Sequence, residues 1–193
     1  MHLYNVLLGL SLLSTTYALW PQPRQITTGT TALRLARDFS VSLAGVNGAP
    51  KDLQDAVRRT QDSLKKDKLQ PLVPDRGASN KGSVSSAPTL RTLRLRYTGQ
   101  GKVKSISDEA IAPLDTRVEG YTLTVPADGS EAVLAANSSL GLFRGLTTFG
   151  QIWYDLDGTT YTLEAPFAIE DSPAYVSVAL PPNHELVTDM YLP

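Results

Sequence analysis

A hydrophobic pattern with helical spacing marks residues 137–154. At about 100° per residue, its apolar positions share one side of a helix: Leu142, Leu146, Phe149 and Trp153. The polar positions share the opposite side: Arg144, Thr147, Thr148 and Gln151. Burying large apolar side chains of this kind stabilises a fold by roughly 1.5–3 kcal/mol each. We therefore expect an amphipathic helix that anchors the core.

Glycine and serine residues indicate how closely this predicted helix packs and where it begins. Gly141 and Gly145 lie one turn apart beside the apolar side, where a missing side chain lets another backbone approach closely. Either Ser138 or Ser139 is expected to cap the start, since a serine hydroxyl accepts from free backbone N–H groups. No glutamate or glutamine stands at the position that would complete a capping box.

Alternation of apolar and polar residues predicts short strands elsewhere in the chain. In chain order they cover 25–28 and 31–35, as one or two strands joined at Gly29, then 39–43, 92–97, 121–125, 131–135, 159–163 and 167–169. The pair Asp128-Gly129 is typical of a hairpin turn that leads towards the helix. Apolar residues at helical spacing predict a second helix over 51–68. Together these elements predict an α+β fold, with an antiparallel or mixed sheet and two helices packed on one face.

Residues 70–89 lack a regular apolar pattern and are rich in proline, glycine and serine. Such a composition offers too little apolar surface to order a segment. A connection of this length in a compact domain is usually a mobile excursion from the fold. We therefore expect an exposed, flexible loop over 70–89.

The first 18 residues are typical of a secretory signal peptide. Residues 3–13 are almost wholly apolar, and small residues suited to cleavage lead up to Ala18. The apolar run is shorter than the roughly 20 residues that a membrane span needs. We therefore expect removal of residues 1–18 and a secreted, extracellular protein with no membrane partner after cleavage.

The charge and composition of the 193-residue chain argue against several classes of partner and cofactor. Its 18 basic and 19 acidic residues give a net charge of −1, and lysine and arginine do not gather in one stretch, so no nucleic-acid partner is expected. The chain has no cysteine, so the domain depends on its core rather than on disulfides. The sequence offers neither a metal-ligand cluster nor a glycine-rich phosphate motif, and we expect no metal site and no cofactor.

The predicted helix and its surroundings also carry a family resemblance. The motif is Leu-Phe-Arg-Gly-Leu-Thr-Thr-Phe-Gly-Gln-Ile-Trp at 142–153, with Ala-Ala-Asn before it at 135–137 and Ile-Glu-Asp-Ser-Pro-Ala-Tyr after it at 169–175. A further segment, Trp-Pro-Gln-Pro-Arg, stands at 20–24. These residues closely resemble the non-catalytic N-terminal domain of secreted, fungal-type β-N-acetylhexosaminidases of glycoside hydrolase family 20.

This resemblance implies both a fold and domain limits. The family's accessory domain is zincin-like, and the similarity here stops at Tyr175. We therefore expect one hexosaminidase N-terminal domain over 19–175 and an unmatched tail over 176–193. The domain's partner in a complete family member is a catalytic (β/α)8 barrel of the same chain, which takes about 250 residues. This chain therefore looks truncated.

The family removes terminal N-acetylhexosamine from chitin oligomers and glycans, and the substrate's own acetamido group acts as the nucleophile. The family's catalytic Asp-Glu pair belongs to the barrel. The resemblance therefore implies no catalytic residue in this chain and no activity when the chain stands alone. The alternative is a stand-alone secreted binding or interaction module, which an exposed apolar patch would mark.

Two acidic pairs in the chain look like catalytic carboxylates. Asp108-Glu109 has the order of the family's pair, but we expect solvent-exposed carboxylates near a strand end. Glu170-Asp171 stands where the family passes into its barrel, and we expect a structural role there. The family's Arg-Gly, whose arginine holds the sugar, would come a few residues later, but residues 176–180 read Val-Ser-Val-Ala-Leu.

Two other residues are candidates for chemistry. After removal of the signal peptide, His184 is the one histidine in the sequence. It has neither the context of a Ser-His-Asp triad nor the second histidine of a zinc-binding helix. Asn137-Ser138-Ser139 is the sole N-glycosylation sequon, although the same residues also serve the helix start. Asn137 is therefore a candidate for N-glycosylation.

Overall fold

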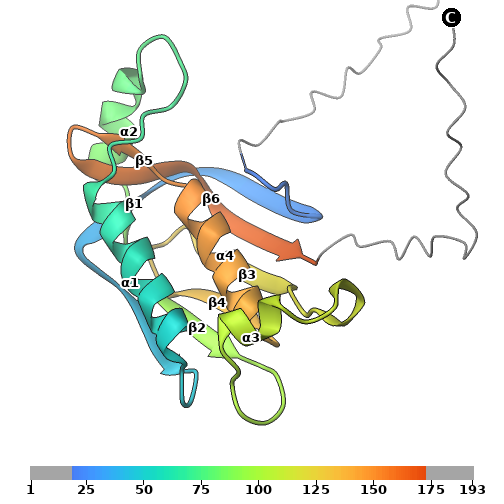
Figure 1. Cartoon of the computed structure of the whole chain (residues 1–193). Coiled ribbons are helices and arrows are strands. Elements are labelled where there is room, and N and C mark those ends of the chain that lie inside the picture. The colour runs from blue at the N-terminus through green and yellow to red at the C-terminus, as the bar shows by residue number, and fades with distance from the viewer. Residues whose placement is uncertain (1–18, 173–193) are drawn as a thin grey trace, which may run out of the picture.

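A six-stranded mixed sheet forms the centre of the computed structural model, which describes residues 19–172 (Figure 1). Its strands are β1 (Gln25–Gly45), β2 (Thr89–Tyr97), β3 (Tyr121–Val125), β4 (Ala132–Ala136), β5 (Tyr154–Leu156) and β6 (Thr159–Asp171). Their order across the sheet is β1-β2-β4-β3-β6-β5. The β1–β2 and β2–β4 pairs are parallel, and the remaining pairs are antiparallel. The predicted signal peptide (1–18) and tail (176–193) lie outside the described residues.

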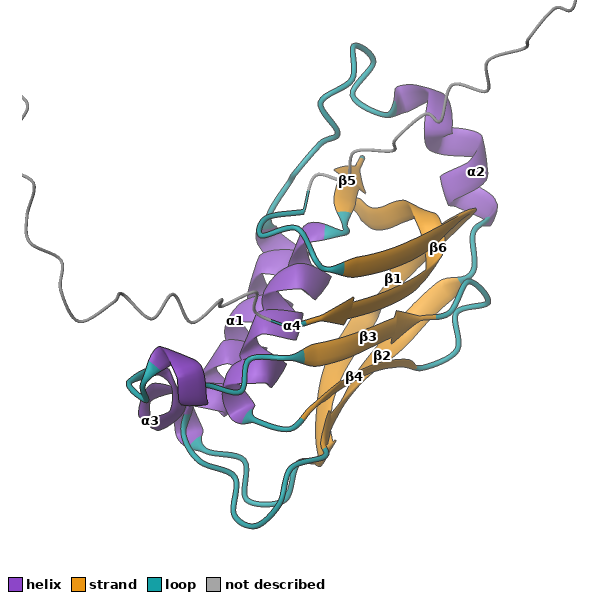
Figure 2. Cartoon of the chain, turned by 90° about the vertical axis from the view of Figure 1, so that its right-hand side faces the viewer, coloured by secondary structure: helices purple, strands orange, loops and turns teal. Residues whose placement is uncertain are grey.

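Two long helices, α1 (Lys51–Lys66) and α4 (Ser139–Gln151), lie side by side on one face of this sheet (Figure 2). The shorter helical elements are α2 (Lys81–Ser86), α3 (Ile106–Ala110) and the 3₁₀ turns η1 (Ala78–Asn80) and η2 (Leu114–Thr116). The α+β fold with two helices packed on one face is confirmed. The sheet is of the mixed kind, and α1 ends two residues earlier than the pattern predicts.

β1 is one continuous strand where the sequence predicts up to three. Its first half pairs with β6, from Gln25 opposite Glu170 to Arg34 opposite Tyr161, and its second half pairs with β2. Gly29 does not turn the chain. It lies at a shift in the β1–β6 register, where a Cβ atom would stand 2.4 Å from the carbonyl oxygen of Ala165. A glycine inside a strand commonly marks such a bulge and close backbone approach.

α4 packs on the sheet beside α1, in contact with β3, β4 and α1. Leu142, Leu146 and Phe149 are buried as predicted, and Trp153 is buried just after the helix ends. The ring of Phe149 packs edge-on against that of Trp153, with centroids 5.5 Å apart. Thr148 differs from its prediction, because it is buried rather than on the solvent side of the helix. It lies beside a hydrogen-bonding tyrosine, so burying its hydroxyl leaves no polar atom unpaired.

Residues 70–89, predicted as a loop, contain η1 and α2. Val84 of α2 is buried against Leu156 and Tyr161. One apolar side chain therefore anchors a helix that has no apolar period of its own. The part of the segment before η1 is more open, and Leu72 is almost fully exposed.

Candidate functional site

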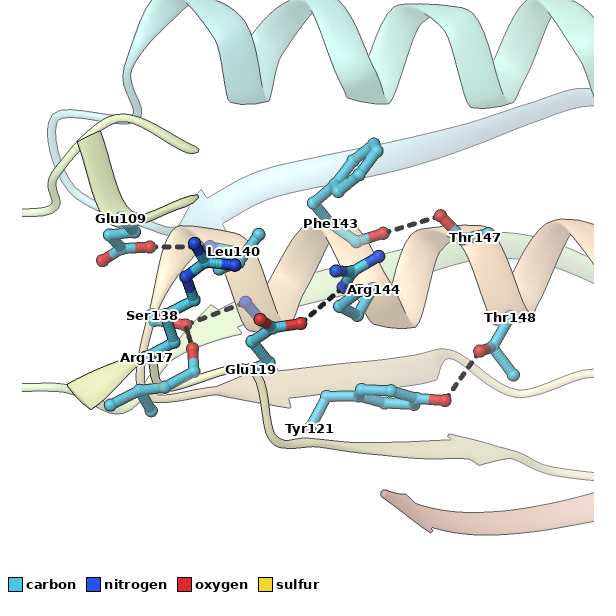
Figure 3. A network of polar contacts seen from close by, with 12 residues as sticks. Glu109, Arg117, Glu119, Tyr121, Ser138, Leu140, Phe143, Arg144, Thr147 and Thr148 are labelled. Atoms are coloured by element: carbon cyan, nitrogen blue, oxygen red, sulfur yellow. Dashed lines mark hydrogen bonds and ion pairs between the residues drawn. The ribbon is translucent and has the colours of Figure 1, made fainter. Parts of the chain in front are cut away.

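A network of polar contacts surrounds the first turn of α4 (Figure 3). Ser138 caps the helix: its Oγ accepts from the backbone N–H of Gly141 at 2.8 Å and donates to the carbonyl oxygen of Val118. Of the two predicted caps, Ser138 therefore plays this role. Its hydroxyl also connects α4 to the segment that leads into β3, because Val118 lies three residues before that strand.

Glu109 of α3 occupies a second position in this network. Its Oε2 accepts from the hydroxyl of Ser139 and from the backbone N–H of Leu140, both at 2.7 Å. A carboxylate at this end of a helix satisfies a free N–H group and interacts favourably with the helix dipole. The expectation of two exposed carboxylates near a strand end is therefore wrong for Glu109, which is half-buried on a helix. Asp108 is exposed, as expected.

An ion pair lies one turn further along α4. The Nε of Arg144 donates to Glu119 at 2.8 Å, and the Glu119 side chain is only 5% exposed. The sequence predicts Arg144 on the polar side of the helix, and its side chain is 45% exposed. From this partly exposed position the Arg144 side chain contacts the buried carboxylate of Glu119. Arg117 donates from Nε to the carbonyl oxygen of Ala112 at 2.7 Å, which holds the same connecting segment together.

Tyr121 and Thr148 form the innermost part of this region. Their hydroxyl oxygens are 2.6 Å apart in the core between β3 and α4 (Figure 3). Burial raises the pKa of Tyr121 to about 12, because the phenolate would lose its hydration. This tyrosine is therefore a neutral hydrogen-bonding group at physiological pH. It braces the helix against the sheet.

A groove with a volume of about 280 Å³ runs between α1, α4 and β5. Its wall and floor include the apolar and aromatic side chains Leu64, Leu69, Phe143, Leu146, Trp153 and Tyr154. Among the described residues that line it, Asp67 is the one carboxylate. Most glycoside hydrolases place two carboxylates around the bond that they break. The groove therefore does not offer the paired acids of that chemistry.

The remaining candidate residues do not converge on one place. Glu170 lies in β6 opposite Gln25 and Thr122, and the backbone N–H of Arg24 donates to Asp171 at 3.2 Å. Asn137 is exposed just before α4. His184 and the segment 176–180 lie outside the described residues.

The described part of the chain contains neither a cluster of metal ligands nor a membrane-spanning helix. Between residues 19 and 172, no three histidine, cysteine or acidic side chains gather as metal ligands do. Over the same residues, none of the helices has the length and apolar character needed to cross a membrane.

The fold and the polar contacts together define the class of this protein. It is an α+β domain in which the buried and half-buried polar groups described above bond to other parts of the same fold and hold its helices in place. A family model described as "beta-acetyl hexosaminidase like" matches residues 19–152. The match covers more than half of the chain, so the chain belongs to this family, the hexosaminidase-like domain of glycoside hydrolase family 20. The resemblance of its sequence to the non-catalytic domain of these enzymes is confirmed at the level of the family.

Solved structures provide a second comparison. A chitobiase from Flavobacterium johnsoniae is 20% identical with a TM-score of 0.52, over 81% of this chain and 21% of that chain. A glycoside hydrolase family 20 β-N-acetylglucosaminidase is 22% identical with a TM-score of 0.44, over 79% of this chain and 22% of that chain. The N-acetyl-β-hexosaminidase of Streptomyces plicatus is 20% identical with a TM-score of 0.42, over 79% and 26%. The chain thus spans about a fifth to a quarter of the length of these proteins. No curated protein matches it.

Proposed function

We propose that residues 19–172 form the non-catalytic domain of a β-N-acetylhexosaminidase whose separate catalytic barrel removes terminal N-acetylhexosamine from chitin oligomers and glycans. The observation that carries this proposal is the family match over 19–152. The similarity of the fold to 21% of a chitobiase is in keeping with it, because most of such an enzyme lies outside the matched domain. In this proposal the domain supports the barrel and takes no part in the reaction.

The contacts of the acidic residues support a non-catalytic role. A general acid must stand within hydrogen-bonding distance of the glycosidic oxygen, in a pocket that binds the sugar. Glu109 instead uses Oε2 to hold Ser139 and Leu140, and Glu119 is buried against Arg144. Asp108 is exposed and is not among the residues that line the groove. Glu109 and Glu119 are therefore engaged in contacts within the fold, and Asp108 faces solvent.

We further propose that the barrel packs on the segment 111–118. Its apolar side chains are exposed: Ile111 is 81%, Leu114 is 54% and Val118 is 49% exposed. The end of β6 lies close by, because Tyr121 at the start of β3 pairs with Asp171 and a Cβ atom on Gly120 would lie 3.5 Å from that of Ser172. Sequence that follows Ser172 in an intact enzyme would therefore begin beside this apolar surface.

The same exposed residues favour the second candidate function, a stand-alone binding or interaction module. Exposed apolar side chains in one short segment are typical of a surface that another protein covers. The two candidates differ in the occupant of this surface: a domain of the same chain in the first, a separate protein in the second. For both we propose a secreted protein in which residues 1–18 are removed and the domain extends over 19–175.

An activity assay tests the non-catalytic assignment. The purified chain, incubated with a chromogenic N-acetylglucosaminide, should release chromophore at the rate of buffer alone. The matched controls are Asp108→Asn and Glu109→Gln, which should match the unaltered chain. Turnover that copurifies with the chain and is abolished by either substitution would overturn the assignment.

A further inference from the structure

The sequon residues at the junction between β4 and α4 face different ways. Asn137 is exposed, and its Oδ1 accepts from the hydroxyl of Thr98 at 2.5 Å. Ser138 is turned towards Val118, before β3, and Ser139 is fully buried with its hydroxyl on Glu109. The amide of Asn137 is thus presented at the surface, while both serine hydroxyls are used inside the fold.

The hydrogen bonding of Asn137 leaves its nitrogen available. Thr98 engages the carbonyl oxygen of the side chain, and among the described residues no hydrogen bond is formed by Nδ2. A substituent on Nδ2 would therefore leave the Thr98 contact in place. It would also project from an exposed position rather than into the core, so the native packing around α4 would not need to change.

We propose that Asn137 is an N-glycan acceptor. The donor is an oligosaccharide joined to a lipid diphosphate through C1 of N-acetylglucosamine, and a membrane-bound transferase brings it to the sequon. A bond forms between Nδ2 and C1, the bond between C1 and the phosphate oxygen breaks, and the lipid diphosphate leaves. The amide gives up one proton, which the transferase or the diphosphate takes. The inference rests on entry into the secretory pathway, not on the catalytic barrel.

The position of Asn137 has two consequences. Ser139 must be recognised as part of the sequon, but its hydroxyl is fully buried in the folded domain, so transfer takes place before the β4–α4 junction folds. The Asn137 side chain is held by Thr98, directly after β2, and the next residue, Ser138, donates to the carbonyl oxygen of Val118 at the end of the apolar segment 111–118. The glycan would therefore be attached close to the end of that segment.

The test is expression of the 193-residue chain in a eukaryotic secretory host, once with its own N-terminus and once behind an established signal peptide. Mass spectrometry of the tryptic peptide 118–144, which contains Asn137 as its one asparagine, measures occupancy. We expect a glycan on this peptide that peptide N-glycosidase removes, leaving aspartate at 137. Asn137→Gln should abolish the modification, and Ser139→Thr, which keeps the sequon, should retain it.

An unmodified Asn137 in the chain carried by the established signal peptide would overturn the inference, because that chain has entered the pathway. Modification that persists in Asn137→Gln would also overturn it. Modification seen only with the established signal peptide supports the acceptor site and contradicts the role proposed for residues 1–18. None of these results affects the non-catalytic assignment, which the activity assay tests separately.

Discussion

The carboxylate of Glu109 lies where the first turn of α4 leaves backbone N–H groups without partners inside the helix. Its acceptor bonds to Ser139 and Leu140 join residues that are 30 and 31 positions apart in the chain. A local sequence pattern identifies Ser138 as a cap, because capping by serine involves its near neighbours. It cannot identify Glu109, because only the packing of α3 on α4 brings that residue into place.

The role of Glu109 predicts an effect on stability. Glu109→Ala removes the acceptor for a fully buried serine hydroxyl and for a backbone N–H, so the free energy of unfolding should fall by about 1–2 kcal/mol. Asp108→Ala is the matched control on the adjacent, exposed residue and should change it by less than about 0.5 kcal/mol. Urea unfolding followed by tryptophan fluorescence measures both values. Equal midpoints for the two variants would contradict the role of Glu109.

Tyr121 predicts a pH dependence. Its pKa is raised from the ordinary value of about 10 to about 12 in the folded protein, chiefly because burial disfavours the charged form. A raised folded-state pKa contributes stability that is fully present below pH 10 and is lost as the pH rises from about 10 to about 12. At two pKa units this contribution is at most roughly 2–3 kcal/mol.

The comparison with Tyr121→Phe isolates this contribution. The pKa values of Tyr154 and Tyr161 are also raised by burial, but both residues are present in either protein. The unfolding free energy of the unaltered chain should therefore fall more steeply above pH 10 than that of Tyr121→Phe. Parallel pH profiles for the two proteins would show that Tyr121 does not titrate as its burial requires.

At the scale of elements, the glycines of α4 explain how closely this helix packs. A Cβ atom on Gly141 would lie 2.5 Å from the carbonyl oxygen of Gly120, and one on Gly145 would lie 2.1 Å from Leu134 Cδ1. The close backbone approach predicted for both glycines is thus confirmed for Gly141, whereas Gly145 makes room for side chains of the sheet, Leu134 and Tyr121. A Cβ atom on Gly150 in the same helix would meet no other atom within 4 Å. Three glycines of one helix therefore have different constraints.

This difference predicts that replacing glycine with alanine has opposite effects on the stability of the domain at positions 141 and 150. Gly141→Ala gains about 1 kcal/mol of helix propensity but clashes with backbone, so it should destabilise the domain by a net amount of about 1–3 kcal/mol. Gly150→Ala meets open space and should stabilise it by about 0.4–1 kcal/mol. Thermal or urea unfolding of the two variants decides the signs. Stabilisation by Gly141→Ala would contradict the close contact between α4 and the segment before β3.

Elements with a strong local pattern could be predicted from the sequence, and those set by distant contacts could not. The β3–β4 hairpin forms around Gly129, whose φ of 81° suits glycine, and its strands pair with Leu123 opposite Leu134. α1 and α4 follow from their apolar spacing. The length of β1 depends on two different partners, β6 and β2, and α2 depends on the burial of Val84, so neither appears in a local pattern.

At the scale of the whole molecule, the two ends of the described chain lie together. Gln25 of β1 pairs with Glu170 of β6, and Figure 1 shows the segment 19–24 and the end of β6 on the same side of the domain. Gln151 at the end of α4 exchanges two hydrogen bonds with the backbone of Trp20, at 2.7 and 2.8 Å. The sheet and α4 thus fix where the chain enters the domain and where it leaves.

The candidate site was predictable from the sequence only as separate residues. The sequence identifies Asn137 as a sequon and Asp108-Glu109 as an acidic pair. The order of strands, which separates Thr98 from Val118 and brings Glu109 to α4, is a property of the whole fold. No local pattern indicates the ion pair between Arg144 and Glu119, because its residues are 25 positions apart.

Sequencing of full-length transcripts that encode residues 19–172 shows whether this domain accompanies a catalytic barrel. We expect transcripts in which the codon for Tyr175 is followed by an Arg-Gly pair and, further on, by a barrel-length segment with an Asp-Glu pair. Transcripts that all end without such a segment would contradict the proposed non-catalytic domain of a hexosaminidase and favour the stand-alone module.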